Sequence, residues 1–393
     1  MSGRIRKIRK LPKINNFLYL GIFIFILKVY GSASSILPFY NDIIDTCLSL
    51  LGSCCMVIHC IQKRFYNTRT FLIYVFVACL SVYSIVVIGN YNIFITVITC
   101  FAIRGEKTAD VIEFLFRYEL LFFSMHLIYA LFRMLLIGDD YMQVISGVAR
   151  YNMGLGHPNR FSIFVFNLLL MWIWLNFSTI RLKNIVIIFL ISLLNYEITK
   201  TRTNEIAIMI LLVILLLYKV NSFKMSSCLK NLAMLIVPAL EVCSVAMVIL
   251  YSYSNSLILD MLDKILSARI RLGAYGYNNY GITFLGQHVL TDEIQYDTTY
   301  RLSYFTFDNI YTDIAIQQGL IWVVIVSILF FLLARKKNDA SNFAIIAWGI
   351  YGITEVHGLN VYMLFVVLLV NELFQNKKPN LLTTLIILKG WAE

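Results

Sequence analysis

Residues 320–337 read LIWVVIVSILFFLLARKK, a run of fifteen uncharged, mostly apolar residues closed by Arg335, Lys336 and Lys337. Together with the apolar residues that precede it from about 309, this run is long enough to cross the hydrocarbon core of a bilayer as a helix. Basic residues next to such a helix favour the cytoplasmic side. The stretch therefore predicts a transmembrane helix that ends in the cytoplasm.

The whole chain shares this character. Of its 393 residues, 60% are hydrophobic and 14% charged, and the mean hydropathy is +0.77. Soluble domains carry about 45–50% apolar and about 25% charged residues. The composition excludes a soluble enzyme, a nucleic-acid-binding protein and a disordered chain. The net charge of +11 is therefore informative through the positions of the basic residues.

Twelve apolar segments are candidates for transmembrane helices, and three of them, the fourth, seventh and eighth, are short for a full crossing. The sequence thus predicts an all-α polytopic membrane protein, with residues 1–393 forming a single integral membrane domain. The expected spans are 15–37, 43–61, 70–88, 91–103, 112–137, 161–179, 185–199, 204–219, 231–251, 309–333, 340–355 and 359–375.

The distribution of basic residues orients these helices. If the basic run between Arg4 and Lys13 is cytoplasmic, cytoplasmic segments carry 22 of the 33 Lys and Arg and outer segments only eight. Because a miscounted helix would invert every later segment, the alternation predicts twelve spans with both termini in the cytoplasm. The largest outer segment, residues 252–308, lies between helices 9 and 10. Its aromatic and apolar content predicts an ordered cap.

Charged residues inside the spans are costly and commonly functional. Lys28, Arg117 and Arg133 lie near helix ends and can extend towards the membrane surface. Glu119 and Glu241 have no such exit, and they are the residues on which a transporter would depend.

Several outer segments place Arg or His beside Asn, Tyr or acidic residues. A cationic site at the membrane surface suits a phosphate group on a lipid, because the guanidinium fork binds phosphate oxygens in a bidentate way. The candidate ligand-binding residues are Arg150, His157, Asn159, Arg160, Arg269, Arg271, Tyr275 and Asn309, and the candidate catalytic residues are Arg202, His288, Asp308 and Glu355.

These residues also have structural interpretations. His157–Pro158 can begin the sixth helix, Thr203 or Asn204 can cap the eighth, and Asp308–Asn309 can cap the tenth. Arg269 and Arg271 can be anchors for anionic headgroups. The acidic pairs Asp139–Asp140 and Asp292–Glu293 could hold a divalent ion, but adjacent acids are common in loops, and neither a metal nor another cofactor is expected.

Four stretches together resemble the family of bacterial O-antigen polymerases and O-antigen ligases: RYNMGLGHPNRFSIF at 150–164, ITKTRTNEIAI at 198–208, LSARIRLG at 266–273 and FDNIYTDIAIQQG at 307–319. The resemblance covers about the last two-thirds of the chain. It implies a membrane enzyme whose large outer loop lies late in the sequence, as it does here. The ligase branch carries a His in that loop, for which His288 is the candidate.

The resemblance implies a metal-independent, inverting glycosyltransferase that joins polyprenyl-diphosphate-linked oligosaccharides into an exopolysaccharide, capsule or O-antigen on the outer face of the cytoplasmic membrane. Arg202, with Arg150 or Arg269, would hold the diphosphate, and Asp308, Glu355 or His288 would accept the proton of the attacking hydroxyl. Of these, Arg202 is expected to be the most important, so that Arg202→Lys and Arg202→Ala both lose polymer. Tyrosines such as Tyr275 would stack on sugar rings.

Two alternatives remain open at this stage. A ligase would transfer the finished glycan to another acceptor, and a transporter or lipid-oligosaccharide flippase would use Glu119 and Glu241 instead of the outer residues. The expected partners are the lipid-linked oligosaccharides, membrane lipids, a chain-length regulator and a flippase, and no nucleic acid.

Overall fold

The computed structural model describes residues 16–62, 68–89, 91–145, 147–254, 256–336 and 338–375. The basic residues expected in the cytoplasm are in part outside these ranges: Arg4, Arg6, Lys7, Arg9, Lys10, Lys13, Lys63, Arg64, Lys337, Lys377, Lys378 and Lys389.

Within the described residues the regular secondary structure is helical apart from two short hairpins. Nine helices come first: α1 (Phe17–Ala33), α2 (Asp42–Gln62), α3 (Thr68–Ile88), α4 (Asn92–Ala102), α5 (Thr108–Leu136), α6 (Pro158–Asn176), α7 (Leu182–Thr199), α8 (Arg202–Val220) and α9 (Ser222–Tyr253). The hairpin β1 (Met142–Ile145) to β2 (Val148–Tyr151) connects α5 to α6, with Met142 opposite Tyr151.

The last third of the chain is less regular. After α9 come α10 (Leu257–Ile265), α11 (Arg269–Tyr280) and the hairpin β3 (Glu293–Asp297) to β4 (Leu302–Tyr304). The remaining elements are α12 (Ile310–Asp313), the π-helical turn η1 (Ile314–Gln318), α13 (Leu320–Ala334), α14 (Asp339–Gly352), the 3₁₀ turns η2 (His357–Leu359) and η3 (Phe365–Val370), and α15 (Asn371–Phe374).

Helical elements occupy every range in which the sequence predicts a span. In the described part of the chain, seven helices are long and apolar enough to cross a membrane: α2, α3, α5, α6, α7, α8 and α9. Shorter apolar helices are Phe17–Ala33, Asn92–Ala102, Leu320–Ala334 and Phe365–Phe374. These helices mark the chain as a multi-pass membrane protein. The apolar side chains that α7 exposes (Val186 49%, Leu190 57%, Leu194 62%) fit contact with lipid.

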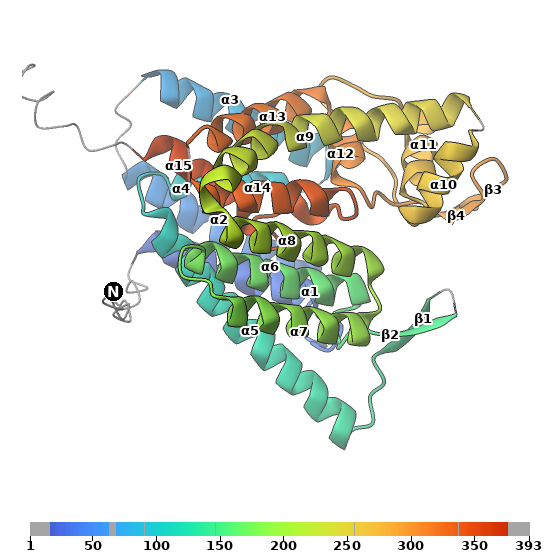
Figure 1. Cartoon of the computed structure of the whole chain (residues 1–393), viewed down its shortest axis with the longest axis horizontal. Helices are drawn as coiled ribbons and strands as arrows, with labels where there is room; N and C mark the ends of the chain where they lie inside the picture. Colours follow the sequence, from blue (N-terminus) through green and yellow to red (C-terminus); the bar gives the residue numbers. More distant parts are fainter. Residues whose placement is uncertain are drawn as a thin grey trace, which may run out of the picture.

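In Figure 1 most helices of the bundle run from left to right. The elements α10, α11, β3, β4 and the β1–β2 hairpin lie at its right-hand end. We call residues 252–308 the cap and this end of the bundle the cap end. The cap has an apolar cluster of its own that includes Leu272, Tyr300, Phe305 and Phe307, packed against Val248 of α9. It is therefore an ordered part of the fold.

The expected tenth helix is interrupted at Gly319, where φ is +96°. The loop that precedes β3 lies against this interruption: Leu320 N donates to Thr283 O (3.0 Å) and Gln287 N donates to Gln317 O (2.9 Å). A Cβ at Gly319 would overlap the backbone of Gly286. Such contacts satisfy the backbone groups that a broken helix leaves free.

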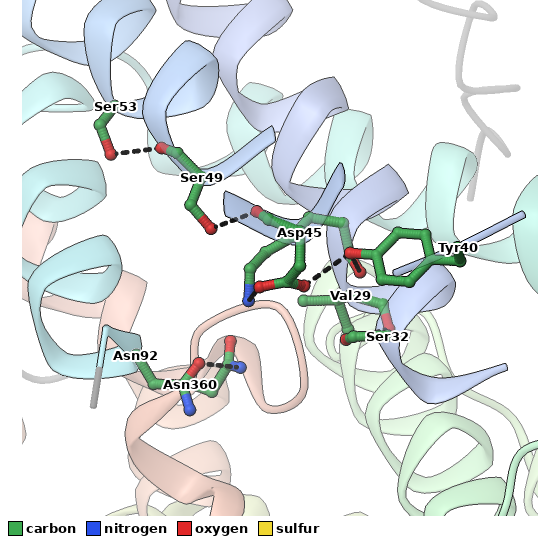
Figure 2. A network of polar contacts seen from close by, with 9 residues as sticks. Val29, Ser32, Tyr40, Asp45, Ser49, Ser53, Asn92 and Asn360 are labelled. Atoms are coloured by element: carbon green, nitrogen blue, oxygen red, sulfur yellow. Dashed lines mark hydrogen bonds and ion pairs between the residues drawn. The ribbon is translucent and has the colours of Figure 1, made fainter. Parts of the chain in front are cut away.

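An ion pair joins α1 to α2 near the cap end. Lys28, whose side chain is 11% exposed, lies 3.4 Å from Asp45 Oδ2. The Tyr40 hydroxyl donates to Asp45 Oδ1 (2.6 Å), and Figure 2 shows these groups packed between the helices. Lys28 therefore has a charge partner on the neighbouring helix, a pairing that its position in the sequence does not reveal.

Candidate functional site

Charged side chains from distant parts of the sequence meet at the cap end. They come from β2, the start of α6 and the turn between them, and from the start of α11, the segment before α12 and the segment after α14. Their charges act on one another: Asp308 interacts with His157 and Arg269, and Glu355 with Asp308 and Arg269. We call the following residues the polar cluster: Arg150, His157, Arg160, Asn204, Arg269, Asp308, Tyr351, Glu355 and His357.

Arg269 lies at the centre of the polar cluster and is only 6% exposed. Its Nε donates to the carbonyls of Asp308 and Thr354 (both 3.1 Å), its Nη2 to Thr354 O (2.7 Å) and its Nη1 to Leu266 O (3.0 Å). A single guanidinium thus ties the start of α11 to the segments before α12 and after α14. Its charge also stabilises anions nearby.

The two carboxyl groups of the cluster, Asp308 and Glu355, are desolvated. Burial raises the pKa of Glu355 to about 8, with Arg269 opposing and Asp308 adding to the shift. Burial also raises the pKa of Asp308, although Arg269 and His157 act to lower it. Glu355 follows the end of α14 and is 7% exposed. A carboxyl whose pKa lies near the working pH is suited to accept a proton in a reaction.

Two buried polar atoms of the cluster, Arg150 Nε and Glu355 Oε1, have no hydrogen-bond partner among the described residues, whereas the Asn204 amide and the Tyr351 hydroxyl have each other as their polar neighbours. Buried polar groups are satisfied in the great majority of cases, so exceptions gathered in one place need a reason. Donors and acceptors that converge without protein partners are what a polar ligand would bind.

Two imidazoles complete the cluster. The Nδ1 atom of His157 accepts from Asn159 N (3.2 Å), which implies that the neutral ring carries its proton on Nε2. Desolvation lowers the pKa of His157, and Asp308 opposes this shift. Burial, with a smaller effect of Arg160, lowers the pKa of His357 to about 4, so this ring is neutral at pH 7.

The prediction that His157–Pro158 begins a helix is confirmed, since α6 starts at Pro158 and His157 is its N-cap. Asn309 caps α12 and accepts from Tyr311 N (2.9 Å), as its structural interpretation requires. The prediction that Thr203 or Asn204 caps the eighth helix is wrong, because α8 begins at Arg202 and both residues lie inside it.

A buried group of hydroxyls fixes the turn between α7 and α8. Ser162 Oγ lies 3.1 Å from Thr199 Oγ1 and 2.6 Å from Thr201 Oγ1, and Asn195 Nδ2 donates to Ser162 Oγ (2.9 Å). These contacts hold the first turn of α8 against α6 and thereby direct Asn204 towards Tyr351. From the sequence, Asn204 is expected only as a helix cap, and nothing in the local pattern marks Tyr351.

Arg202, expected to be the most important residue, lies on a different face. The exposed side chains of α8 include Ile206 (58%) and Val213 (55%), whereas Asn204, Ala207, Leu211 and Leu215 are buried. At 100° per residue, Arg202 falls on the exposed stripe and Asn204 on the opposite side. Among the described residues no hydrogen bond or ion pair of the Arg202 side chain is present, a geometry that suits a surface anchor.

Other expected site residues lie apart from the cluster. His288 is exposed and its Nδ1 lies 3.3 Å from Ile88 O, at the end of α3. Tyr275 packs edge to face on Tyr300 inside the cap. Arg271 Nε lies 3.4 Å from Asp263 Oδ2. Asn159 is half-buried and contributes its backbone N–H to His157.

Acidic pairs do not gather into a metal site in the described ranges, where no group of three or more His, Cys, Asp and Glu side chains has a geometry that could hold a metal ion. Asp139 instead accepts from Arg133 Nε (2.5 Å) and from the Tyr141 hydroxyl (2.9 Å).

Neither a protein-family model, nor a curated protein, nor a solved structure matches this chain.

Proposed function

We propose that this chain is a membrane glycosyltransferase that joins lipid-diphosphate-linked oligosaccharides into a polysaccharide. The observation that carries the proposal is the polar cluster. In it, three arginines and two desolvated carboxyls lie at one end of an apolar bundle, among buried polar atoms without protein partners. The similarity to O-antigen polymerases in four stretches, each of which contributes at least one residue to this cluster, supports the same function.

Each part of the cluster has a role in this reaction. Arg160 and Arg150 bind the diphosphate oxygens, and Arg269, whose donors are largely engaged by carbonyls, supplies fixed positive charge behind them. Glu355 accepts the proton of the attacking sugar hydroxyl while that oxygen forms a bond to the anomeric carbon. The bond from this carbon to the diphosphate breaks, and its electron pair leaves with the diphosphate, where the guanidinium groups stabilise the developing charge. Direct displacement inverts the anomeric centre.

The proposal includes the orientation in the membrane. Twelve crossings with both termini in the cytoplasm place the cap end on the outer face of the cytoplasmic membrane. Two observations support this: basic residues are concentrated in the segments expected at the opposite end, and Arg269, at the start of α11 in the cap, binds the carbonyls of Asp308 and Thr354 in the polar cluster. A lipid diphosphate presents its charge at headgroup depth, where such a cluster would lie.

The test is polymer formation by membranes that carry Glu355→Gln or Arg160→Ala. Both variants should lose polymer while single lipid-linked repeat units accumulate, as read by gel electrophoresis of the glycan and by mass spectrometry of the lipid fraction. Removing one group that acts on developing charge costs about 10²–10³ in rate. Glu197→Gln and Arg335→Ala, which change exposed residues outside the cluster, are the controls. Normal polymer from Glu355→Gln at normal protein level would contradict the proposed role.

A transporter is the second candidate, and it is favoured by buried acids within the bundle. Glu119 is fully buried, its Oε2 accepts from Asn167 Nδ2 (2.9 Å), and its Oε1 has no partner among the described residues. Glu241 is 2% exposed and accepts from the Ser327 hydroxyl. If the cluster carries the chemistry, Glu241→Gln keeps polymer formation. Loss of polymer in Glu241→Gln together with normal polymer in Arg160→Ala would favour transport.

A further inference from the structure

A cavity lies in the cap, apart from the polar cluster. It is open to one side, has a volume of about 880 Å³ and is bordered by the end of α9, by α10, by the start of α11 and by the turn between β3 and β4. Its lining includes Tyr251, Asp260, Lys264, Arg271 and Arg301. We call it the cap cleft. Its volume is in the range of clefts that hold small ligands, about 300–1,000 Å³.

The lining of the cap cleft is polar, and part of its charge is already balanced. Asp263 accepts from the backbone N–H groups of Ile270 and Arg271 (both 3.0 Å) and lies 3.4 Å from Arg271 Nε. Asp260 accepts from the Tyr251 hydroxyl (3.1 Å). Lys264 and Arg301 are exposed and have no ion pair in the described part of the chain. The cleft therefore presents two cations without an ion pair, Lys264 and Arg301, against one carboxylate without an ion pair, Asp260, and its unpaired charge is positive by one.

Hydroxyl and aromatic groups accompany these cations. Thr298, Thr299 and Ser267 line the cleft, and the ring of Tyr251 stacks on that of Tyr300 with centroids 6.5 Å apart. Donors, acceptors and a half-buried tyrosine in one cleft fit the alternating hydroxyl groups and apolar faces of a sugar chain. The two free cations fit carboxylates on those sugars.

The backbone around the cleft is held in an unusual conformation. Ser267, Ala268 and Arg301 have φ values of 55°, 72° and 54°, and they are three of the five non-glycine residues with positive φ in the described ranges. Non-glycine residues held at positive φ tend to gather at ligand sites. Ser267 and Ala268 reverse the chain between α10 and α11, and this reversal shapes one wall.

The first turn of α11 separates the cap cleft from the polar cluster. Arg269 faces the cluster, where it binds the carbonyls of Asp308 and Thr354, whereas Arg271 lies in the cleft beside Asp263. A chain of sugars whose reacting end lies at Glu355 could thus continue past α11 into the cleft.

We propose that the cap cleft binds an acidic oligosaccharide, the glycan portion of the substrate that extends from the polar cluster. This inference rests on the proposed function for its biological meaning, but binding at the cleft can be measured without turnover.

The experiment uses the full chain in lipid nanodiscs and isothermal titration with three probes: hexasaccharides of galacturonate and of hyaluronan, which carry carboxylates, and neutral maltohexaose. At least one acidic probe should bind more tightly than maltohexaose, and its binding should weaken as salt increases. The double variant Lys264→Ala/Arg301→Ala should weaken it by roughly 3- to 30-fold, as expected for two exposed charge pairs. Arg335→Ala, at the opposite end of the bundle, should leave binding unchanged.

The proposal that the cap cleft binds an acidic oligosaccharide is overturned if neither acidic probe binds, or if the double variant leaves their binding unchanged. The two proposals fail separately. If Glu355→Gln makes normal polymer while the cleft still binds the acidic probe, the proposed function is wrong and the proposed binding at the cleft is upheld. If Glu355→Gln abolishes polymer while the double variant changes neither probe binding nor the length of the polysaccharide, the proposed binding at the cleft is wrong and the proposed function is upheld.

Discussion

Glu355→Gln should make the protein more stable and, at the same time, inactive. The folded chain holds the Glu355 proton up to a pKa of about 8, whereas the ordinary value is 4.5. Between these pH values the folded chain binds more protons than the unfolded chain, so stability falls as pH rises from 4.5 to 8. Each pH unit contributes about 1.4 kcal/mol, and by pH 7 the buried carboxyl costs about 3 kcal/mol.

Glutamine has the shape of the protonated acid but does not ionise, so the variant escapes this cost. The measurement is the midpoint of thermal unfolding in detergent, followed by tryptophan fluorescence at pH 6 and pH 8. A gain of about 3–6 °C is expected at pH 8 and a gain about half as large at pH 6. Glu197→Gln, whose side chain is 66% exposed in the wild type, should show no such dependence.

The rate of polymer formation should depend on pH in the opposite direction to the stability. The wild-type rate should rise with pH as Glu355 loses its proton near pH 8, and Glu355→Gln should lose both the rate and this dependence. A variant that is less stable at both pH values, or equally stabilised at both, would refute the assignment of a desolvated, protonated Glu355.

Three further predictions concern other parts of the chain. A reporter fused after Lys183 should be cytoplasmic and one near Tyr275 should be outside; the reverse at either site would mean a miscounted helix. Arg160→Lys should lose polymer, because an ammonium group lacks the guanidinium fork. Arg202→Lys, which changes a residue on the exposed stripe of α8, should still make polymer. If a gel of the glycan shows that Arg202→Lys loses polymer, Arg202 is a phosphate ligand after all. Gly319→Ala should lower the amount of folded protein in the membrane, because a Cβ there overlaps the backbone of Gly286. Gly105→Ala, with φ of +79° and no atom within 4 Å of the added Cβ, should lose only the cost of the left-handed conformation, about 1–2 kcal/mol. Equal levels of the two variants by fluorescence size-exclusion would argue against the close contact at Gly319.

The sequence by itself determined the class of protein and the places of its helices. A helix that crosses lipid needs a long apolar run, and this requirement is local, so composition and run length were enough to locate the helical elements from α1 to α9. The same reasoning located Pro158 at a helix start and Asn309 at a helix cap, because capping depends on neighbouring residues.

The tertiary structure decided which polar residues meet. Arg150, Arg269, Asp308 and Glu355 are far apart in the sequence, and only the packing of α6, α11, α12 and α14 at one end brings them together. Arg202 and Asn204 are two residues apart, yet the helical period of α8 turns one to the exposed face and the other to Tyr351. Lys28 likewise finds Asp45 only because α1 and α2 pack side by side. Pairing and desolvation depend on neighbours across the bundle, and no local pattern of residues records them.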